Sequence, residues 1–217
     1  FFIIFGFFFL AYFFFPLFSY QLFLANASEG DIEVPIPKYL VAKNNNNIGS
    51  LIAERISSIT TNYNDARNWY PDVESKRSNR KVDTYTLSIP KLNIENAEVS
   101  TKDYNLANHL VQYFGTALPG EPGTAIIFGH STIPAWFDPK NYKTIFATLH
   151  TIKIGDEIDA KVDGVTYKYK IFSIEITSPE DTNMFSQSFD HSYITIVTCT
   201  PPGTIWKRLI VRAAMES

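Results

Sequence analysis

Cysteine and histidine are scarce in this chain. Its 217 residues include one cysteine, so no intramolecular disulfide can form, and four histidines, which argues against a Cys/His metal cage. Blocks of Lys or Arg are lacking, and a net charge of −3 gives no basic footprint for nucleic acid. No internal repeat is seen. The single cysteine has no partner for a disulfide within the chain, so its free thiol is a candidate for a chemical role.

Charge is also missing from the N-terminal stretch. The first 24 residues, Phe1 to Leu24, carry no charged side chain and include eleven phenylalanines. Such a stretch spans a ~30 Å hydrocarbon core at about 1.5 Å per residue, which predicts a transmembrane helix. A cleaved signal peptide is the alternative, with Leu24 to Ala27 as a weak cleavage site, but its apolar part usually has roughly 7–15 residues. We expect a retained, single-pass membrane anchor.

Residues 25–83 are expected to be an extracytoplasmic linker. Their first part is polar and irregular, with Pro35, Pro37 and the run Asn44 to Asn47. Within this linker, the apolar spacing over residues 48–67 predicts an amphipathic helix.

From Thr84 onward the chain changes to short β-rich runs, and residues 84–217 are expected to form a folded domain of their own. Asp163-Gly164 indicates a hairpin with a type I′ turn, and Lys140 to His150 is expected to be one short helix. The predicted fold is mainly β, a closed or nearly closed barrel with one or two short helices. The expected strands are Thr84 to Ile89, Thr124 to Gly129, Glu157 to Val162, Val165 to Ile176, Tyr193 to Thr198 and Lys207 to Ala213.

Two motifs carry the chemistry. In the first, the strand Ile194 to Thr198 leads into Cys199, a Pro-Pro-Gly turn follows, and the next strand begins near Arg208. In the second, the segment Gly115 to Gly123 precedes a strand that ends in Gly-His at His130. Together they resemble the active-site signature of the sortase family, with a context similar to that of pilin-polymerising and related sortases. Ser88 to Leu92 and Lys153 to Ile158 resemble family segments in the same order, so the resemblance covers roughly residues 84–213.

The sequence departs from the family pattern at three places. Ile196 stands where the family usually has Leu, and Gln112 occupies the position at which many relatives carry a second His. Pilin-type enzymes often have an Asp-Pro-aromatic lid ahead of the domain. Here Trp69-Tyr70-Pro71-Asp72 has the reversed order, so no lid is expected.

The relative position of Cys199 and Arg208 can be argued without the family resemblance. Alternate residues of a strand face opposite sides. If Ile194 and Ile196 face the core, Cys199 therefore lies on the other face. Leu209 and Val211 likewise leave Arg208 opposite the core. If the two strands are neighbours, Cys199 and Arg208 lie on the same side, where a cation favours the reactive thiolate.

Each assignment has an alternative. A free Cys is often a small buried hydrophobe, and Thr198 is expected either to support the backbone or to act directly. Arg212 and Lys207 are alternatives to Arg208 as the cation beside Cys199. Arg212 lies about 13 Å further along an extended strand, and Lys207 should point to the opposite side of that strand. The remaining histidines have no motif and are expected to be solvated or structural: His109, His150 and His191.

The resemblance implies a mechanism. Cys199 would attack the Thr–Gly bond of a sorting motif such as Leu-Pro-x-Thr-Gly and form a thioester, His130 would protonate the departing amine, and Arg208 would stabilise the oxyanion. No cofactor or metal is expected. The implied partners are sorting-signal-bearing surface proteins or pilins, an amine acceptor of the cell wall or a pilin, and membrane lipid. A cysteine peptidase that uses water and a non-catalytic peptide-binding surface module are the alternatives.

Overall fold

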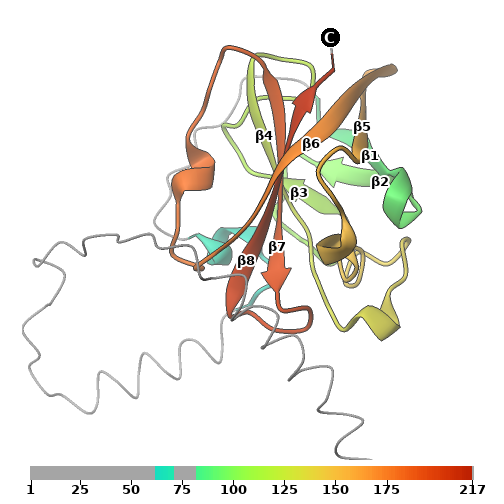
Figure 1. Ribbon diagram of the computed structural model, residues 1–217, viewed down its shortest axis with the longest axis vertical. Coiled ribbons are helices and arrows are strands. Elements are labelled where there is room, and N and C mark those ends of the chain that lie inside the picture. Colours follow the sequence, from blue (N-terminus) through green and yellow to red (C-terminus); the bar gives the residue numbers. More distant parts are fainter. Residues whose placement is uncertain (1–61, 71–81, 217) are drawn as a thin grey trace, which may run out of the picture. The chain divides into compact units, whose positions relative to one another are not determined.

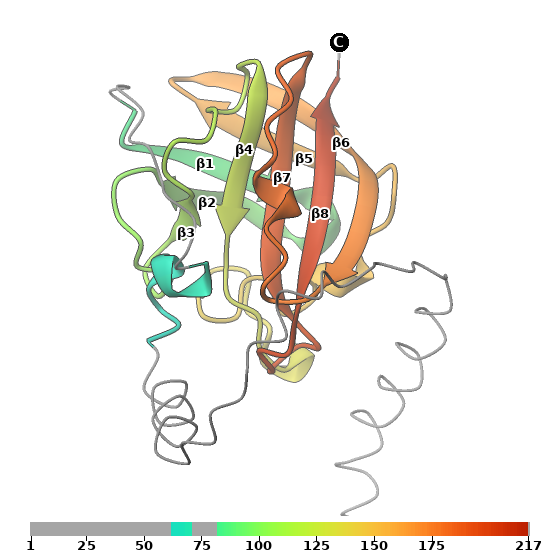
Figure 2. The same ribbon diagram turned by 90° about the vertical axis from the view of Figure 1, so that its left-hand side faces the viewer.

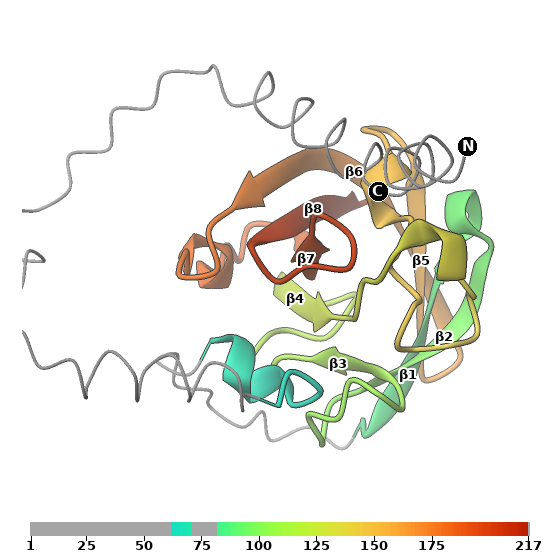
Figure 3. The same ribbon diagram turned by 90° about the horizontal axis from the view of Figure 1, so that it is seen from below.

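The structure, a computed structural model, describes residues 62–70 and 82–216, all within one compact unit, Ser58–Ser217. Eight strands close into a barrel in the order β1-β2-β3-β4-β7-β8-β6-β5, visible as a ring in Figure 3. The closed, mainly β barrel expected from the sequence is confirmed. The strands are β1 Thr84–Ile89, β2 Ile94–Ser100, β3 Leu110–Gln112, β4 Gly123–Phe128, β5 Glu157–Val162, β6 Val165–Thr177, β7 Ser192–Thr200 and β8 Lys207–Met215.

Strand β4 is the first of three neighbouring strands, β4, β7 and β8, that form the functional part of the barrel wall (Figures 1 and 2). It pairs in parallel with β7, and β7 pairs in antiparallel fashion with β8. All six residues of β4 are buried, as are eight of the nine in β7. Near-continuous apolar runs are typical of strands covered on both faces. The β4–β7–β8 portion of the barrel wall is therefore packed on its outer side as well.

The turns agree only in part with the sequence expectations. Asp163 and Gly164 have φ values of 49° and 84°, so the expected turn with two positive-φ residues joins β5 and β6. The helix expected over Lys140 to His150 is wrong: the stretch forms turns that end in a 3-10 helix, Leu149–Thr151. One reason is that the amide of Phe146 donates to the carbonyl of His130 at 3.0 Å and is not free for a helical bond.

Two hydrophobic clusters stabilise the described chain. The larger one fills the barrel and includes Ile194, Ile196, Leu209 and Val211, as the alternation pattern predicts. The second lies on the outer face of β4, β7 and β8. It is made of Ala66, Trp69, Tyr70, Leu106, Val111, Tyr113, Ile126, Phe128, Met184, Val197, Cys199 and Ile210.

Residues 62–70 help to cover that outer face (Figures 2 and 3). They contain a short 3-10 helix, Ala66–Trp69, and belong to the range expected to be linker. The expected helix over 48–67 falls mainly on residues outside the described ones, and the expected anchor over 1–24 falls there entirely. Within residues 62–70 and 82–216, no helix has the length and apolar character to span a membrane.

Candidate active site

Cys199 and Arg208 face each other across two neighbouring strands. They are direct partners in the β7–β8 register, and Nη1 of Arg208 donates to Sγ of Cys199 at 3.6 Å. The same Nη1 contacts the carbonyl oxygens of Ile205 at 3.1 Å and Lys207 at 3.3 Å, which fixes the guanidinium beside the thiol. The two strands are therefore neighbours, which is the condition under which side-chain alternation places Cys199 and Arg208 on the same side.

Burial and charge act on the Cys199 thiol in opposite directions. Its residue is 6% exposed and Arg208 is 2% exposed. Burial raises the pKa of Cys199, because the thiolate loses hydration, and the neighbouring Arg208 lowers it by a smaller amount. In this arrangement the thiol is mainly protonated at neutral pH, and Arg208 is placed to stabilise negative charge as soon as it develops.

The parallel pairing of β4 and β7 brings His130 to the same end of the barrel. Phe128 is the register partner of Val197, and the amide of Gly129 donates to the carbonyl of Val197 at 3.2 Å. Thr198 then donates its hydroxyl to the carbonyl of Gly129 at 2.7 Å. Since His130 directly follows Gly129, these bonds tie its backbone to the residue next to Cys199.

Gly129 is required by the packing around it. A Cβ added there would lie 2.4 Å from an atom of the Phe146 ring and 2.7 Å from Cδ2 of Leu110, closer than real side chains approach. The glycine of the Gly-His motif therefore allows the chain to pass between two core side chains before it presents His130.

His130 has a polar partner that the sequence did not suggest. Its Nε2 lies 3.0 Å from Oδ1 of Asn64, and its ring centroid lies 6.0 Å from that of Trp69. Burial lowers the pKa of His130 to about 4, and the charge of Lys143 acts in the same direction. The imidazole is thus neutral at physiological pH and can accept a proton.

An aromatic cover lies over the arginine. The guanidinium carbon of Arg208 lies 5.0 Å from the ring centroid of Trp69, which is buried and donates its indole N–H to the carbonyl of Tyr63. Tyr70 packs on Phe128 with a centroid distance of 5.8 Å. Burial raises the pKa of Tyr70. To a smaller extent, the charge of Arg208 lowers this pKa and that of Cys199 raises it.

The sequence predicted no lid, because Trp69 and Tyr70 lie in an order reversed from the family's. The structure differs, since contact with Arg208 needs only an aromatic face and does not depend on that order. The only sequence feature that pointed to this cover is that two aromatic residues, Trp69 and Tyr70, are adjacent in a polar, charged stretch. Asn64 gave no sequence signal at all.

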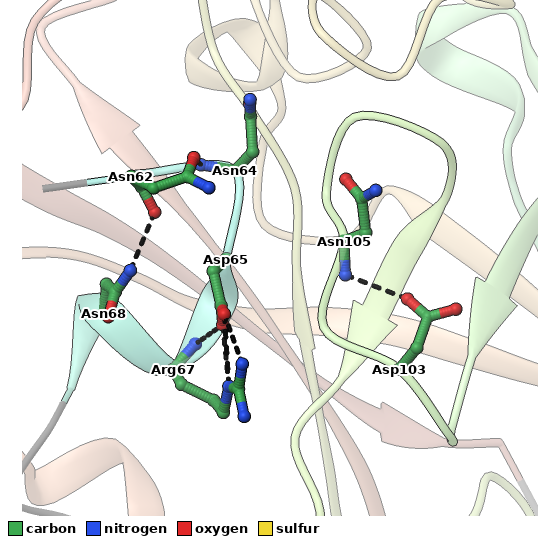
Figure 4. Close-up of polar contacts among 7 residues, drawn as sticks. All are labelled: Asn62, Asn64, Asp65, Arg67, Asn68, Asp103 and Asn105. Carbon is green, nitrogen blue, oxygen red and sulfur yellow. Dashed lines mark hydrogen bonds and ion pairs between the residues drawn. The ribbon is translucent and has the colours of Figure 1, made fainter.

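The segment that carries the cover has polar contacts of its own (Figure 4) and one bridge to the barrel. The side chain of Asp65 accepts bonds from Arg67, and Asn68 donates to the carbonyl of Asn62. Asp65 also forms an isolated antiparallel bridge with Asn105 of the β2–β3 connection. These short-range bonds give residues 62–68 a defined shape beside the site.

The other candidate residues have structural partners. Thr198 points away from Cys199 and holds Gly129, which fits the supporting role. Arg212 is the register partner of Thr195 and pairs with Glu175 at 3.4 Å, away from the thiol. The remaining groups are bonded as follows: His109 to Asp103 and the Leu110 carbonyl, His191 to the Met215 carbonyl, and Gln112 to Thr116 and Ala117.

Comparisons with solved structures show the same barrel fold in sortases. Sortase D5 transpeptidase from Clostridium perfringens is 29% identical with a TM-score of 0.52, over 65% of this chain and 83% of that one. Sortase A from Corynebacterium diphtheriae is 31% identical with a TM-score of 0.53, over 65% of this chain and 63% of that one. A pilus-related Sortase C of Group B Streptococcus shares the fold at 22% identity and a TM-score of 0.53, over 78% and 91% of the two chains.

No curated protein sequence matches the chain. The family model described as Sortase domain matches residues 87–216, which is more than half of the 217 residues and includes both motifs. The chain therefore belongs to the sortase family.

Proposed function

We propose that this protein is a transpeptidase that cleaves a C-terminal sorting motif and transfers the acyl part to an amine, with Cys199 as nucleophile. The observation that carries the proposal is the 3.6 Å contact between Sγ of Cys199 and Nη1 of Arg208, in a chain of the sortase family. A cation beside a buried thiol lowers the free energy of the thiolate and of an adjacent oxyanion.

The proposed reaction has two acyl-transfer steps. Cys199 gives its proton to His130 and attacks the carbonyl carbon of the scissile bond, and the oxyanion that forms is stabilised by Arg208. The carbon–nitrogen bond then breaks, the departing amine takes the proton from His130, and a thioester remains on Cys199. An acceptor amine attacks the thioester carbon and gives a proton to His130. The carbon–sulfur bond then breaks, and the Cys199 sulfur takes that proton from His130 to become a thiol again.

The cover must move before a peptide can reach the nucleophile. Cys199 is buried, and Trp69 lies against Arg208 at 5.0 Å. We therefore assign the described arrangement to a resting state in which Trp69 and Tyr70 occupy the approach to the site.

Two loops beside the site suit a peptide with apolar residues. They follow His130 and Cys199 directly and touch each other, because a Cβ on Gly203 would lie 3.0 Å from Cγ1 of Ile133. Both loops end the barrel on the same side (Figures 1 and 2). They expose Ile133, Trp136, Ile205 and Trp206. Such side chains favour a substrate like Leu-Pro-x-Thr-Gly, whose leucine and proline need apolar contacts.

The proposed setting is the outer face of a membrane. The uncharged run over residues 1–24 supports a single-pass anchor with the barrel outside the cell. The proposed substrates are surface proteins or pilins, and the proposed acceptor is an amine of the cell wall or of another pilin. The likeness to a pilus-related Sortase C motivates the pilin alternative.

The test is a product analysis with the full-length chain in detergent. A Leu-Pro-x-Thr-Gly peptide is incubated with and without a short glycine peptide as amine, and both products are quantified by mass spectrometry. A transpeptidase gives mainly the ligated product when the amine is present. Hydrolysis to the same extent with and without the amine would support the cysteine peptidase. A peptide that stays intact, although Cys199 of the same protein reacts with thiol reagents, would refute both the transpeptidase and the peptidase.

A further inference from the structure

Asn64 contacts His130 from a part of the chain 66 residues away. The distance from its Oδ1 to Nε2 of His130 is 3.0 Å. Asn64 lies ahead of the matched family region, which begins at residue 87, and no motif identified it. The contact is therefore an addition to the Cys199, His130 and Arg208 set.

The backbone of Asn64 is held on both sides. Its carbonyl accepts from the amide of Leu106 at 2.7 Å, and its amide donates to Oδ1 of Asn62 at 3.1 Å. Two residues later, the amide of Ala66 donates to the carbonyl of Tyr104 at 3.0 Å, and both Ala66 and Leu106 are fully buried. Residues 62–66 thus form a strap fixed to the β2–β3 connection, whereas the cover residues come after it.

The chemistry of the two side chains sets the direction of the bond. An amide oxygen only accepts, so Nε2 of His130 must carry the hydrogen. Neutral imidazole has one N–H and one lone pair, and the lone pair is then on Nδ1. Among residues 62–70 and 82–216, no hydrogen bond to Nδ1 is formed. Nδ1 is left free to take up a proton.

We propose that Asn64 is a positioning residue, which holds His130 with its hydrogen on Nε2 and leaves Nδ1 as the atom that exchanges protons in the reaction. This inference rests on the proposed function. In the first step the Cys199 proton moves to Nδ1, and the resulting imidazolium keeps its Nε2–H bond to Asn64. In the second step the Nδ1 proton moves to the departing amine, and the original neutral tautomer is restored.

A neutral partner suits this role better than a carboxylate. The charge that acts on His130 is that of Lys143, from the loop after β4. Asp65 and Arg67, which follow Asn64 in the chain, contact each other, as do Arg208 and Cys199. An amide orients the ring without adding charge, whereas a carboxylate would stabilise the imidazolium and hold its proton back. Figure 4 shows the Asn64 side chain directed away from the Asp65–Arg67 pair.

The decisive measurement is the tautomer of His130, read from imidazole ¹⁵N chemical shifts. The full-length chain in detergent micelles is labelled on its four histidines, and the His130→Gln variant assigns the signal. We expect the Nε2–H form in the natural chain and a mixture of both tautomers in Asn64→Ala. Asn68→Ala is the control, since Asn68 lies on the same segment and its side chain donates to the Asn62 carbonyl, with no bond to His130 within residues 62–70 and 82–216.

A second variant covers the case in which Asn64→Ala disturbs the strap. Asn64→Asp keeps the shape and adds a charge, so the pKa of His130 should rise by about 1 unit or more while the hydrogen stays on Nε2. In peptide transfer, Asn64→Ala should lower kcat with KM unchanged, and by less than the ~10²-fold expected for loss of a general acid.

Several outcomes would separate the two ideas. Equal tautomer populations in the natural chain and Asn64→Ala, or an unchanged pKa in Asn64→Asp, would overturn the assignment of Asn64. A shifted tautomer in a protein that never cleaves the peptide would instead refute the proposed transpeptidation and leave Asn64 as the residue that orients His130.

Discussion

Trp69 lies over the guanidinium of Arg208, with 5.0 Å between Cζ of the arginine and the centroid of the indole ring. The arginine that contacts the Cys199 thiol is therefore also the residue on which the aromatic cover packs. A cation over an aromatic face contributes about 0.5–2 kcal/mol, more when both are buried. This single contact links access to the site with the electrostatics of the thiol.

Truncation of the cover should expose the thiol. Trp69→Ala removes a contact of about 0.5–2 kcal/mol, which corresponds to roughly a 2- to 30-fold shift toward the open state. Less burial also lowers the pKa of Cys199, because burial is the main cause of its increase. We expect iodoacetamide to label Cys199 faster by a similar factor, measured by mass spectrometry over time. Trp136→Ala is the control, since Trp136 is 66% exposed; equal labelling rates in the two variants would contradict the cover.

Replacement of the nucleophile should stop the reaction at its first step. Cys199→Ala has no atom that can form the thioester, and it removes only a small side chain from the outer cluster. Mass spectrometry of the protein incubated with a Leu-Pro-x-Thr-Gly peptide should show an acyl adduct on the natural chain and none on the variant. An adduct on Cys199→Ala would place the nucleophile elsewhere.

Arg208 and Arg212 provide a matched pair of substitutions on one strand. Arg208→Lys keeps the charge but loses the rigid fork of donors, so we expect a loss of ~2.7–4 kcal/mol of transition-state stabilisation, as for one oxyanion donor. The fall should appear mainly in kcat if Arg208 acts in the transition state. Arg212→Lys should stay within about threefold of the natural rate, because Arg212 pairs with Glu175 and lies about 13 Å along the strand. The opposite result would reject Arg208.

The pH dependence of the rate should report the Cys199–His130 pair. Burial lowers the pKa of His130 to about 4 and raises that of Cys199 above its usual value. The proton acceptor is lost when pH falls through the lower value, and the transferable proton is lost when pH rises through the upper one, so the kcat/KM profile should be a broad bell. His130→Gln should remove the acidic limb and slow the reaction by about 10²-fold or more. An unchanged profile would assign the proton transfer to another group.

Stability should also depend on pH through His130. Its pKa falls from 6.5 to about 4 on folding, so between these values the unfolded chain binds a proton that the folded chain does not. Stability is therefore lost as pH decreases through this window, and this group causes no further change below it. Thermal unfolding at about pH 7 and pH 4.5 should show a larger decrease in Tm for the natural chain than for His130→Gln. Equal decreases would mean that the ring is accessible to solvent.

The pairing of Cys199 with Arg208 was predictable because it depends on local patterns. Ile194 and Ile196 mark one face of β7, Leu209 and Val211 mark one face of β8, and a short turn joins the two strands. Two-residue periodicity fixes which side chains share a side once such strands pair. The sequence therefore contained this half of the site in full.

The rest of the site depends on long-range contacts that leave no periodic pattern in the sequence. Asn64 and Trp69 reach the site from a segment that the family pattern does not include, and their contacts with His130 and Arg208 follow no sequence pattern. The outer face of β7 was expected to be simply the non-core side, but Met184 and Tyr70 cover it. The helix expected at Lys140 to His150 failed for a similar reason, since the Phe146 amide bonds to a distant carbonyl. Long-range partners of this kind cannot be inferred from one sequence.

The parallel pairing of β4 with β7 has a consequence for how the protein becomes active. The bond from Thr198 to Gly129 joins residues 69 positions apart, and the intervening chain includes β5 and β6. Contacts of such sequence separation form slowly, because the entropy of closing the long loop is lost before the pairing is gained. β7 and β8, which carry Cys199 and Arg208, are also the last two strands of the barrel in chain order. A partly folded chain in which β4, β7 and β8 have not yet paired therefore has no assembled site.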